Sequence, residues 1–476
     1  MFALIFLHIY FVSFLDKPEK TVPQLSPRAI EQRDKWDIPT DQMDYPVSQL
    51  YQNNLRKMGV KILHVSRWFN GATCEMNEEL AAKVAKEKYV TDVELTRETP
   101  VSEPDPLPIK RKEPDNMTMS PSNAETPDGK GTVNQLQLFN LLPLHEAGYE
   151  GQGILMAFCD GGFGNADQLP CFRQKELHLG SFDLTDDTTD FYNAESGSHG
   201  TACLSIVSGI DKENAFYGAA TKAQYYLLRS EEVHTESPKE MDNLVVALEK
   251  ADSLGVNVFS VSLGYYFFDS HDTLPKEALD GRTTRASLAA TIAARKGMLV
   301  CVAAGNEGNK IWHSISVPAD ADSIITVGAV GLDSVNTAFS SYGPSADGRI
   351  KPEVCALGQQ TTIIRPSGEV KNGNGTSYAT PLIAGLAAAL WSALPDENAM
   401  QIRERIIRST DRYSFPDKGQ YGYGIPNAWK AYTMKREESS YNGQWLDEQP
   451  RKIIRGEQIL IIRHGHVYNL AGQRLE

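Results

Sequence analysis

The stretch NGNGTSYATPLIAGLAAALWSAL, residues 372–394, decides how the rest of the chain is interpreted. Its first half is rich in glycine, which favours a tight turn. Its second half is a run of small and aliphatic residues without charge, typical of a buried helix and too short to span a bilayer. Pro381 is expected in the first turn of this helix, where its missing N–H costs no hydrogen bond.

Ser377 lies where the turn meets the helix. At the N-terminus of a buried helix, a hydroxyl lies at the positive end of the helix dipole and close to unpaired backbone N–H groups. That environment suits a nucleophile whose attack generates an oxyanion. A serine that only caps the helix fits the same pattern, so the rest of the chain has to decide between the two interpretations.

The composition is that of a globular protein with an acidic balance. The chain has 476 residues, of which 41% are hydrophobic and 23% charged, so one large domain with smaller ones is expected. The net charge of −14 argues against nucleic acid or an anionic membrane as a partner. Beyond the first residues no stretch is long and apolar enough for a transmembrane helix, so no stable membrane span is expected.

The first residues, MFALIFLHIYFVSFL, are apolar but lack the basic segment and the small-residue cleavage site of a complete signal peptide. We interpret residues 1–14 as part of a signal segment, truncated here, that runs into a first strand at residues 9–14.

The six cysteines form no CxxC pair and no cluster with the spacing of metal ligands. They are Cys74, Cys159, Cys171, Cys203, Cys301 and Cys355. Most of them lie inside apolar segments, so buried free thiols are expected in preference to disulfides.

Residues 15–97 alternate helical and strand patterns and predict a small α+β unit. Helices are expected at SPRAIEQRDKW, VSQLYQNNLRKMG and EELAAKVAKE, and strands at VKILHVSRWF and VTDVELT. Ser26, followed by Pro27, is typical of an N-cap for the first of these helices. Residues 98–132 are rich in proline and charge and poor in large apolar residues, which is typical of a linker. The basic run Lys110-Arg111-Lys112 is either a place for a protease to cut or a solvated charge run.

From Gly151 the pattern becomes that of an α/β domain. Apolar runs of strand length alternate with helical segments: ILMAFC, AQYYLLR, VNVFSVSL, GMLVCVAAG and SIITVGAV. The runs are apolar on both faces, as in a parallel sheet that helices cover on both sides. Ligand sites in such folds lie at the carboxyl ends of the strands, so polar residues there are the candidates.

Four polar residues stand out next to glycines: Asp160, His199, Asn306 and Ser377. Each alone has a plain explanation as a turn, cap or structural residue. Together they supply a nucleophile, a base, a carboxylate that orients the base and an amide donor, which is the full set for acyl transfer. A serine cannot attack at neutral pH without a base, histidine titrates in the right range, and a carboxylate behind the imidazole stabilises the imidazolium.

The order of these residues, with HGTA at His199, AAGN at Asn306 and GTSYATP at Ser377, resembles that of the subtilisin-like serine endopeptidases, the subtilases. The resemblance extends over about residues 134–432. It implies that Asp160, His199 and Ser377 form a catalytic triad and that Asn306 donates to the oxyanion. It also implies an α/β, three-layer, subtilisin-like fold with a central, mostly parallel sheet.

The same resemblance implies where substrate binds. Two triplets match the walls of the cleft: Ser262, Leu263 and Gly264 on the strand that pairs with the substrate backbone, and Ala303, Ala304 and Gly305 on the facing wall. An extended peptide would bind there as an added strand. Main-chain hydrogen bonds would give the affinity, so little sequence preference is expected. The aromatic run YYFF at 265–268 hints at apolar substrate side chains.

One departure follows the catalytic aspartate, where the family usually has serine or threonine and then glycine. This chain has Gly161 and Gly162, which removes a possible hydrogen bond and keeps the carboxylate. The resulting DGGF resembles a variant among bacterial subtilases of the Bacteroidetes type.

The flanks resemble those of a secreted zymogen. Residues 9–97 are similar to the propeptides of those subtilases, which implies a small α+β domain that covers the cleft, assists folding and leaves after a cut in a linker at 98–133. The catalytic domain is then expected at 134–435. Residues 436–476 are expected to form a linker and a β-hairpin tail, which resembles sorting signals and is equally consistent with a stabilising hairpin.

The resemblance thus implies a bacterial enzyme that is secreted or held in the cell envelope, with protein or peptide substrates and its own propeptide as partners. No cofactor is needed for the chemistry; structural calcium is common in the family, but no metal ligands can be assigned, and His464 and His466 carry little weight. One alternative is a catalytically inactive, peptide-binding protein of the same fold.

A second alternative is an esterase of the α/β-hydrolase type. Such an enzyme has a GxSxG motif and the chain order Ser, Asp, His. This chain has the sequence GTSYA at residues 375–379 and the order Asp, His, Ser, which argues against it.

Overall fold

A computed structural model describes residues 7–97, 131–172, 174–185, 190–193, 197–232, 236–269, 272–435, 451–455, 458–463 and 466–469. The chain divides into two compact units, Met1–Met434 and Lys435–Glu476. Four expectations fall outside the described residues: the start of the signal segment, the linker with its basic run at 110–112, the linker that follows residue 435, and His464.

The first unit is built on a sheet of seven strands in the order β13-β12-β11-β10-β5-β9-β6, and every neighbouring pair is parallel. The strands are β5 (Leu155–Asp160), β6 (His178–Asp183), β9 (Gln224–Arg229), β10 (Val258–Val261), β11 (Leu299–Ala303), β12 (Ile325–Val330) and β13 (Val354–Leu357). The five apolar runs predicted strands correctly. The edge strand β6 was missed because half-exposed residues alternate along it, and β13 because it is short.

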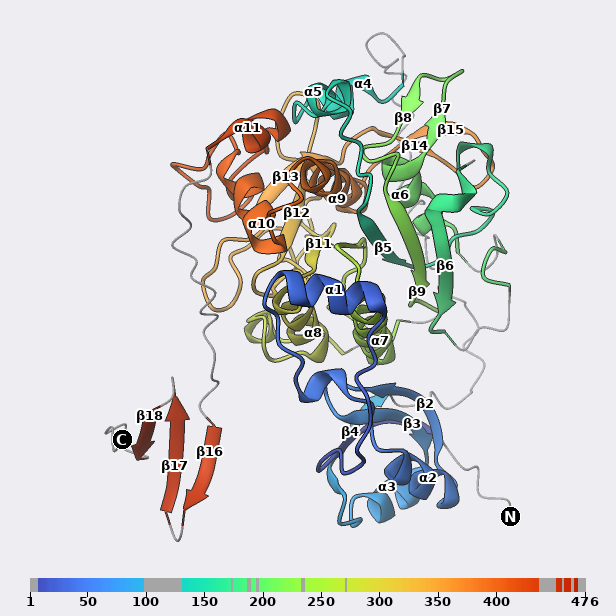
Figure 1. Cartoon of the computed structure of the whole chain (residues 1–476), viewed down its shortest axis with the longest axis vertical. Coiled ribbons are helices and arrows are strands. Elements are labelled where there is room, and N and C mark those ends of the chain that lie inside the picture. Colours follow the sequence, from blue (N-terminus) through green and yellow to red (C-terminus); the bar gives the residue numbers. More distant parts are fainter. Residues whose placement is uncertain are drawn as a thin grey trace. The chain divides into compact units, whose positions relative to one another are not determined.

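Helices cover both faces of this sheet (Figure 1). On one face lie α6 (His199–Ser208) and α9 (Thr376–Ala393), and on the other α7 (Pro238–Leu254) and α8 (Arg285–Arg295). The side chains of β5 alternate accordingly: Met156 and Phe158 belong to the core under α6 and α9, and Ala157 and Cys159 to the core under α7 and α8. The predicted three-layer α/β fold is confirmed.

Shorter elements surround the α9 side. They are α4 (Val133–Gln137), α5 (Leu142–Glu146), the strand pair β7 (Ile210–Asp211) and β8 (Phe216–Tyr217), the hairpin β14 (Thr361–Ile364) and β15 (Val370–Gly373), α10 (Ala399–Arg408) and α11 (Ala428–Thr433). The β14–β15 hairpin leads directly into α9. None of the helices in the described part of the chain is both long and apolar enough to cross a bilayer.

The N-terminal residues form an antiparallel sheet in the order β2-β3-β1-β4. Its elements are β1 (His8–Phe14), α2 (Gln49–Lys57), β2 (Lys61–Ser66), β3 (Gly71–Met76), α3 (Glu78–Val84) and β4 (Val90–Arg97). The strand expected at 9–14 is present as β1. Strand β3 was missed because its sequence, GATCEM, has no aromatic residue and only one β-branched residue, Thr73.

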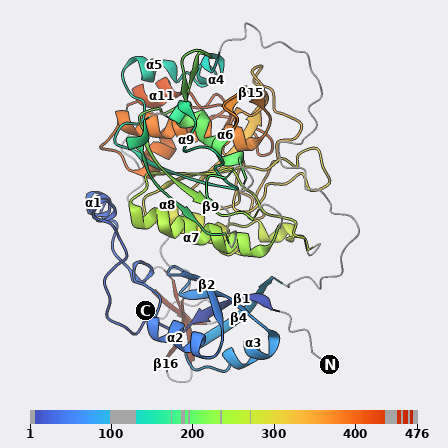
Figure 2. The same cartoon turned by 90° about the vertical axis from the view of Figure 1, so that its right-hand side faces the viewer.

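This N-terminal domain packs on the outer side of α7 and α8, away from the face that α9 covers (Figure 2). The expectation that the domain covers the cleft is therefore wrong for its described residues, because Ser377 lies at the start of α9. Strands β2 and β4 contact α7, and so does helix α1 (Pro27–Lys35), which leaves the small sheet and lies along the larger domain. The predicted cap of α1 is present, because the Ser26 hydroxyl oxygen accepts from the Ala29 N–H at 3.1 Å. The Arg28 guanidinium then donates to the Gly255 carbonyl at 3.0 Å and to the Asn257 side chain at 2.7 Å.

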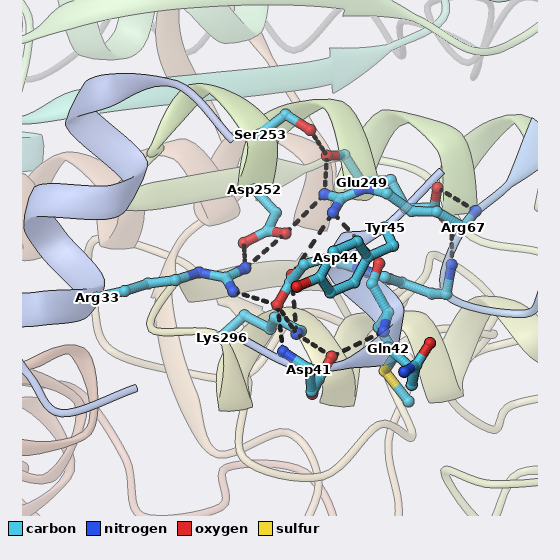
Figure 3. A network of polar contacts seen from close by, with 12 residues as sticks. Arg33, Asp41, Gln42, Asp44, Tyr45, Arg67, Glu249, Asp252, Ser253 and Lys296 are labelled. Atoms are coloured by element: carbon cyan, nitrogen blue, oxygen red, sulfur yellow. Dashed lines mark hydrogen bonds and ion pairs between the residues drawn. The ribbon is translucent and has the colours of Figure 1, made fainter. Parts of the chain in front are cut away.

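A buried network of charges joins the two domains (Figure 3). Arg33 and Arg67 of the N-terminal domain both donate to the Asp252 carboxylate of α7, at 2.7 and 2.6 Å. In the opposite sense, Lys296 at the end of α8 donates to the Asp44 carboxylate of the N-terminal domain at 3.0 Å. Each domain therefore supplies both signs of charge, and removal of one partner leaves the others with fewer buried ion pairs.

Glu249, one turn before Asp252 on α7, holds the turn that follows β2. Its carboxylate accepts from the Ser66 hydroxyl at 2.5 Å and from the backbone N–H groups of Arg67 and Trp68 at 2.9 and 3.1 Å. Trp68 is buried in the same apolar cluster as the residues under α7 and α8. The interface thus combines a buried aromatic side chain with carboxylates that accept several hydrogen bonds each, which is typical of a specific interface.

The second unit is a three-stranded antiparallel sheet, with β16 (Arg451–Arg455), β17 (Gln458–Arg463) and β18 (His466–Asn469) in that order. The predicted hairpin is present as β17 and β18. Strand β16, which pairs with the other edge of β17, was not predicted.

The network predicts that Asp252→Ala weakens the docking of the N-terminal domain. In a full chain that also carries Ser377→Ala, so that the expected self-cleavage does not interfere, we expect a loss of about 3 kcal/mol in the free energy of unfolding, because two buried guanidinium groups lose a shared carboxylate. Urea unfolding followed by circular dichroism measures it. Glu79→Ala, which removes an exposed partner of Lys83, is the matched control, and equal midpoints for the two variants would contradict the prediction.

Candidate active site

The carboxyl ends of the central strands bring the candidate residues to one edge of the sheet. Asp160 is the last residue of β5, Ser262 follows β10 directly, and Ala304 follows β11. Strand β5 has β9 on one side and β10 on the other, so the strand order reverses at β5. A crevice at such a reversal is where ligands bind in open α/β sheets.

Asp160 and His199 form a hydrogen-bonded pair. His199 is the first residue of α6, and its Nδ1 lies 2.7 Å from the Asp160 Oδ1. Asp160 is 2% exposed, and the same oxygen accepts from the Gly161 N–H at 2.8 Å. Because an ionised carboxylate can only accept, Nδ1 carries a proton and donates, which leaves Nε2 of the neutral ring as the acceptor.

Glycines allow α6 to approach the end of β5 this closely. A Cβ on Gly200 would lie 2.8 Å from the Cβ of Asp160 and 2.6 Å from the Gly162 carbonyl oxygen. Gly197 has φ +97°, and a Cβ there would lie 2.3 Å from the Gly161 carbonyl oxygen. The glycines that flank His199 therefore allow the short distance between His199 and Asp160.

The environment of His199 raises its pKa well above the ordinary value for histidine. Burial by itself disfavours the imidazolium, but the charge of Asp160 and its hydrogen bond to Nδ1 outweigh burial. A neighbouring carboxylate thus makes this imidazole a stronger base than a solvated one.

Ser377 is the second residue of α9, and it is 7% exposed. The expectation that Pro381 occupies the first turn of this helix is wrong: α9 begins at Thr376, and Pro381 lies inside it. Gly375 is the N-cap, and the helix follows at once, so Ser377 lies where the glycine-rich turn meets the helix. The missing N–H of Pro381 therefore deprives the Ser377 carbonyl of its helical hydrogen bond.

Ser377 and His199 lie close together without a hydrogen bond between them. The Cys203 Sγ lies 3.7 Å from the His199 Nδ1 and 3.4 Å from the Ser377 carbonyl oxygen, and the His199 ring is 5.7 Å from that of Tyr378. The Ser377 hydroxyl donates to the Ser262 carbonyl at 3.2 Å. Of the expected contacts, the carboxylate–imidazole bond is present, and the serine hydroxyl points to Ser262.

Asn306 lies beside the start of α9 with its orientation fixed. Its Oδ1 accepts from the Thr376 N–H at 2.9 Å and from the Thr376 hydroxyl at 3.1 Å. Because Oδ1 is held there, Nδ2 is the free donor, and it faces the Gly375–Ser377 backbone, where a Cβ on Gly375 would lie 3.7 Å from it. The Asn306 amide donor and the Ser377 N–H thus lie near each other at the start of α9.

The two triplets predicted to line the cleft follow adjacent strands. Ser262, Leu263 and Gly264 come after β10, and Ala303, Ala304 and Gly305 end β11 and follow it. Beyond them the Tyr266 ring stacks on Trp312 with centroids 4.8 Å apart, and its hydroxyl donates to Glu307 at 2.9 Å. The aromatic wall suggested by YYFF is therefore partly polar.

The sequence did not reveal a group of three glutamates near this edge. Glu231, Glu236 and Glu240 bring carboxylate oxygens within 4.8 Å of one another, and Glu231 lies against Gly161. Burial, followed by the charge of Glu236, raises the pKa of Glu231 to about 8, and burial with the charge of Glu231 raises that of Glu240 to about 10. The signal was present in the segment SEEVHTESPKE, but its acidic residues resemble a solvated loop.

Asp160, His199 and Cys203 form a second group with ligand atoms within that distance, and a hydrogen bond already joins Asp160 to His199. All six cysteines are buried and lie within the described part of the chain, where none of them forms a disulfide, as expected.

Two protein-family models match the chain. The model described as "Subtilase family" matches residues 127–424, and "Peptidase S8 propeptide domain, Bacteroidota" matches residues 9–113. Residues 131–424 of this span hold the site described above, and the propeptide match holds the small sheet.

Individual proteins agree with these models. Subtilisin DY of Bacillus licheniformis is 31% identical over 237 residues, which are 50% of this chain and 78% of that protein. The thermostable alkaline protease of Halalkalibacterium halodurans is 25% identical over 365 residues, covering 74% and 89%. The crystal structure of MycP1 from Mycobacterium smegmatis shares the fold, with a TM-score of 0.52 and 20% identity over 65% of this chain and 87% of that one.

The family model covers more than half of the chain, in the region whose sheet and helices carry the candidate residues, and the propeptide model covers the domain docked on α7 and α8. The protein therefore belongs to the subtilase family of serine-type endopeptidases and carries a propeptide domain of the Bacteroidota type.

Proposed function

We propose that the protein is a secreted serine endopeptidase, made as a zymogen, in which Asp160, His199 and Ser377 form the catalytic triad. The observation that carries the proposal is the 2.7 Å bond between Asp160 and His199 at the start of α6, with Ser377 at the start of α9 beside it. The bond fixes the tautomer that leaves Nε2 free to accept a proton.

The residues divide the reaction as follows. His199 Nε2 takes the proton of the Ser377 hydroxyl as Oγ attacks the scissile carbonyl carbon. The oxyanion is held by the Asn306 Nδ2 and the Ser377 N–H, both of which lie at the start of α9. When the intermediate collapses, His199 gives its proton to the leaving amine and an acyl-enzyme remains; water then repeats the sequence and releases the acid.

The Ser377 hydroxyl has to turn before it can react. It donates to the Ser262 carbonyl, and a rotation about its Cα–Cβ bond redirects it towards His199. Such loose contacts are common in free enzymes, and they tighten when substrate binds. A peptide paired in extended form with residues 262–264 donates an N–H to the same edge and favours that rotation.

The substrates are proteins or peptides bound through their main chain between the 262–264 and 303–305 triplets. The reaction needs no cofactor, since the base, the nucleophile and the oxyanion donors all come from the chain. The propeptide domain docked on α7 and α8 supports the zymogen, with a cut between residues 98 and 133 as the step that releases it. Secretion accords with the family and with the apolar first residues.

An inactive peptide-binding protein is the alternative that the first experiment excludes. A fluorophosphonate probe reacts with an activated serine, so we expect it to label the processed protein at Ser377. Ser377→Ala should abolish labelling, self-processing and hydrolysis, with a loss of about 10⁶-fold in kcat, the scale for removing the nucleophile of a triad. Ser392→Ala, which removes a hydroxyl at the far end of α9, should keep all three activities. Labelling at another residue would refute the assignment.

Asn306→Ala tests the oxyanion donor. We expect kcat to fall by about 10²–10³-fold while KM stays within about twofold, because the lost hydrogen bond forms only in the transition state. Steady-state kinetics on a peptide amide measure both constants. Asn306→Asp, which keeps the contact to Thr376 and offers no donor, should be equally slow; a rise in KM alone would assign Asn306 to ground-state binding instead.

The raised pKa of His199 predicts an alkaline enzyme. Only neutral imidazole can act as the base, so kcat/KM should increase with pH until His199 is deprotonated, well above the ordinary titration range of histidine. Asp160→Asn removes the charge that raises the pKa, so this limb should move to lower pH while kcat falls by about 10⁴-fold. A pH profile of both proteins measures the shift, and an unmoved limb would show that another group titrates.

A further inference from the structure

The first turn of α9 lacks a hydrogen bond at the catalytic serine. In an α-helix each carbonyl accepts from the N–H four residues later, and the residue four after Ser377 is Pro381, which has none. Ser377 is 7% exposed, so water does not replace the missing donor freely. A buried carbonyl without a partner is destabilising, because it has lost its hydrogen bonds to water and gained none in the protein.

Two side chains supply the missing donor. The Ser262 hydroxyl donates to the Ser377 carbonyl at 2.9 Å, and the Cys203 thiol lies 3.4 Å from the same oxygen. Ser262 follows β10, and Cys203 lies one turn after His199 on α6. The carbonyl of the nucleophile is therefore tied to the wall of the cleft and to the helix that carries the base.

The hydroxyl is the stronger of the two donors, because a thiol is a weak donor and lies further away. The thiol proton still goes to the carbonyl and not to His199, since Nδ1 is protonated and donates to Asp160. Burial raises the pKa of the Cys203 thiol to about 11, so it keeps its proton at neutral pH.

We propose that the Ser262 side chain is a positioning residue for Ser377, which replaces the helical hydrogen bond that Pro381 removes, with the Cys203 thiol as a weaker second donor. This role differs from the contact of residue 262 with the substrate backbone, because it uses the hydroxyl and not the main chain. The inference rests on the proposed function of Ser377.

The geometry explains why the enzyme gains from this arrangement. The Ser377 hydroxyl has to swing from Ser262 to His199 while its backbone N–H stays aimed at the oxyanion. A donor from outside the helix holds the Ser377 peptide in place without restricting the side chain. Small displacements of a reacting group cost large factors in rate, so loss of the Ser262 hydroxyl should slow the chemical step more than binding.

The first measurement compares Ser262→Ala with the processed wild-type enzyme. We expect kcat to fall about 10-fold while KM stays within about twofold, because the Ser262 carbonyl still pairs with substrate. Ser262→Thr, which keeps the hydroxyl, should restore most of kcat. Ser392→Ala is the control, since that hydroxyl also donates to a carbonyl of α9, at 2.7 Å, at the far end of the helix.

The decisive measurement is a double-mutant cycle with Pro381→Ala, which returns an N–H four residues after Ser377. In that background the cost of Ser262→Ala should shrink to about twofold or less, because the helix supplies the donor itself. An equal loss of kcat in both backgrounds, or a change confined to KM, overturns the proposal. If Ser262→Ala yields no processed enzyme, the comparison uses Ser262→Thr, which keeps a hydroxyl donor, and Ser262→Cys, which offers the weaker thiol donor. We expect a lower kcat for Ser262→Cys, and an equal kcat for the two variants overturns the proposal. The proposed function is tested separately: it holds if the wild type is active and Ser377→Ala is inactive, whatever the Ser262 variants show.

Discussion

The hydrogen bond between Asp160 and His199 is the contact on which the rest of the site depends. It joins the last residue of β5 to the first residue of α6, so it exists only if the sheet and the helix meet at one point. Gly200 and Gly197 allow that approach. The bond also fixes which ring nitrogen carries the proton. Cys203 lies next to that nitrogen, and its thiol contacts the Ser377 carbonyl.

Side chains from neighbouring elements supply hydrogen bonds that α9 and the loop of Asn306 cannot make by themselves. Pro381 leaves the carbonyl of Ser377 without a helical partner, and Ser262 supplies one from β10. The Asn306 amide is oriented by Thr376, which lies on α9 and not on the loop that carries Asn306. The site therefore consists of groups that hold one another in place, so their effects on the rate are not additive.

The N-terminal domain follows the same principle on the other side of the sheet. Arg33 and Arg67 share the Asp252 carboxylate, and Lys296 is paired with Asp44, so each domain neutralises charges of the other. Buried ion pairs of this kind contribute little net stability but penalise any other arrangement strongly. They favour one docked position for a domain that has to recognise its own enzyme, at a place distinct from the cleft that α9 borders.

The sequence alone determined the parallel sheet, its five most apolar strands and the four polar residues beside glycines, because burial and turn chemistry leave local patterns. It also indicated the α1 cap and the strand at 9–14. The sequence did not predict strands β3, β6, β13 and β16, because they are short, exposed at an edge or poor in strand-forming residues. Only the tertiary structure placed Pro381 inside α9, the Ser377 hydroxyl on Ser262, and the charges of α7 against the N-terminal domain. The last two features pair residues more than a hundred positions apart, and neither partner carries a local sign of the other, so the packing of the elements decides them.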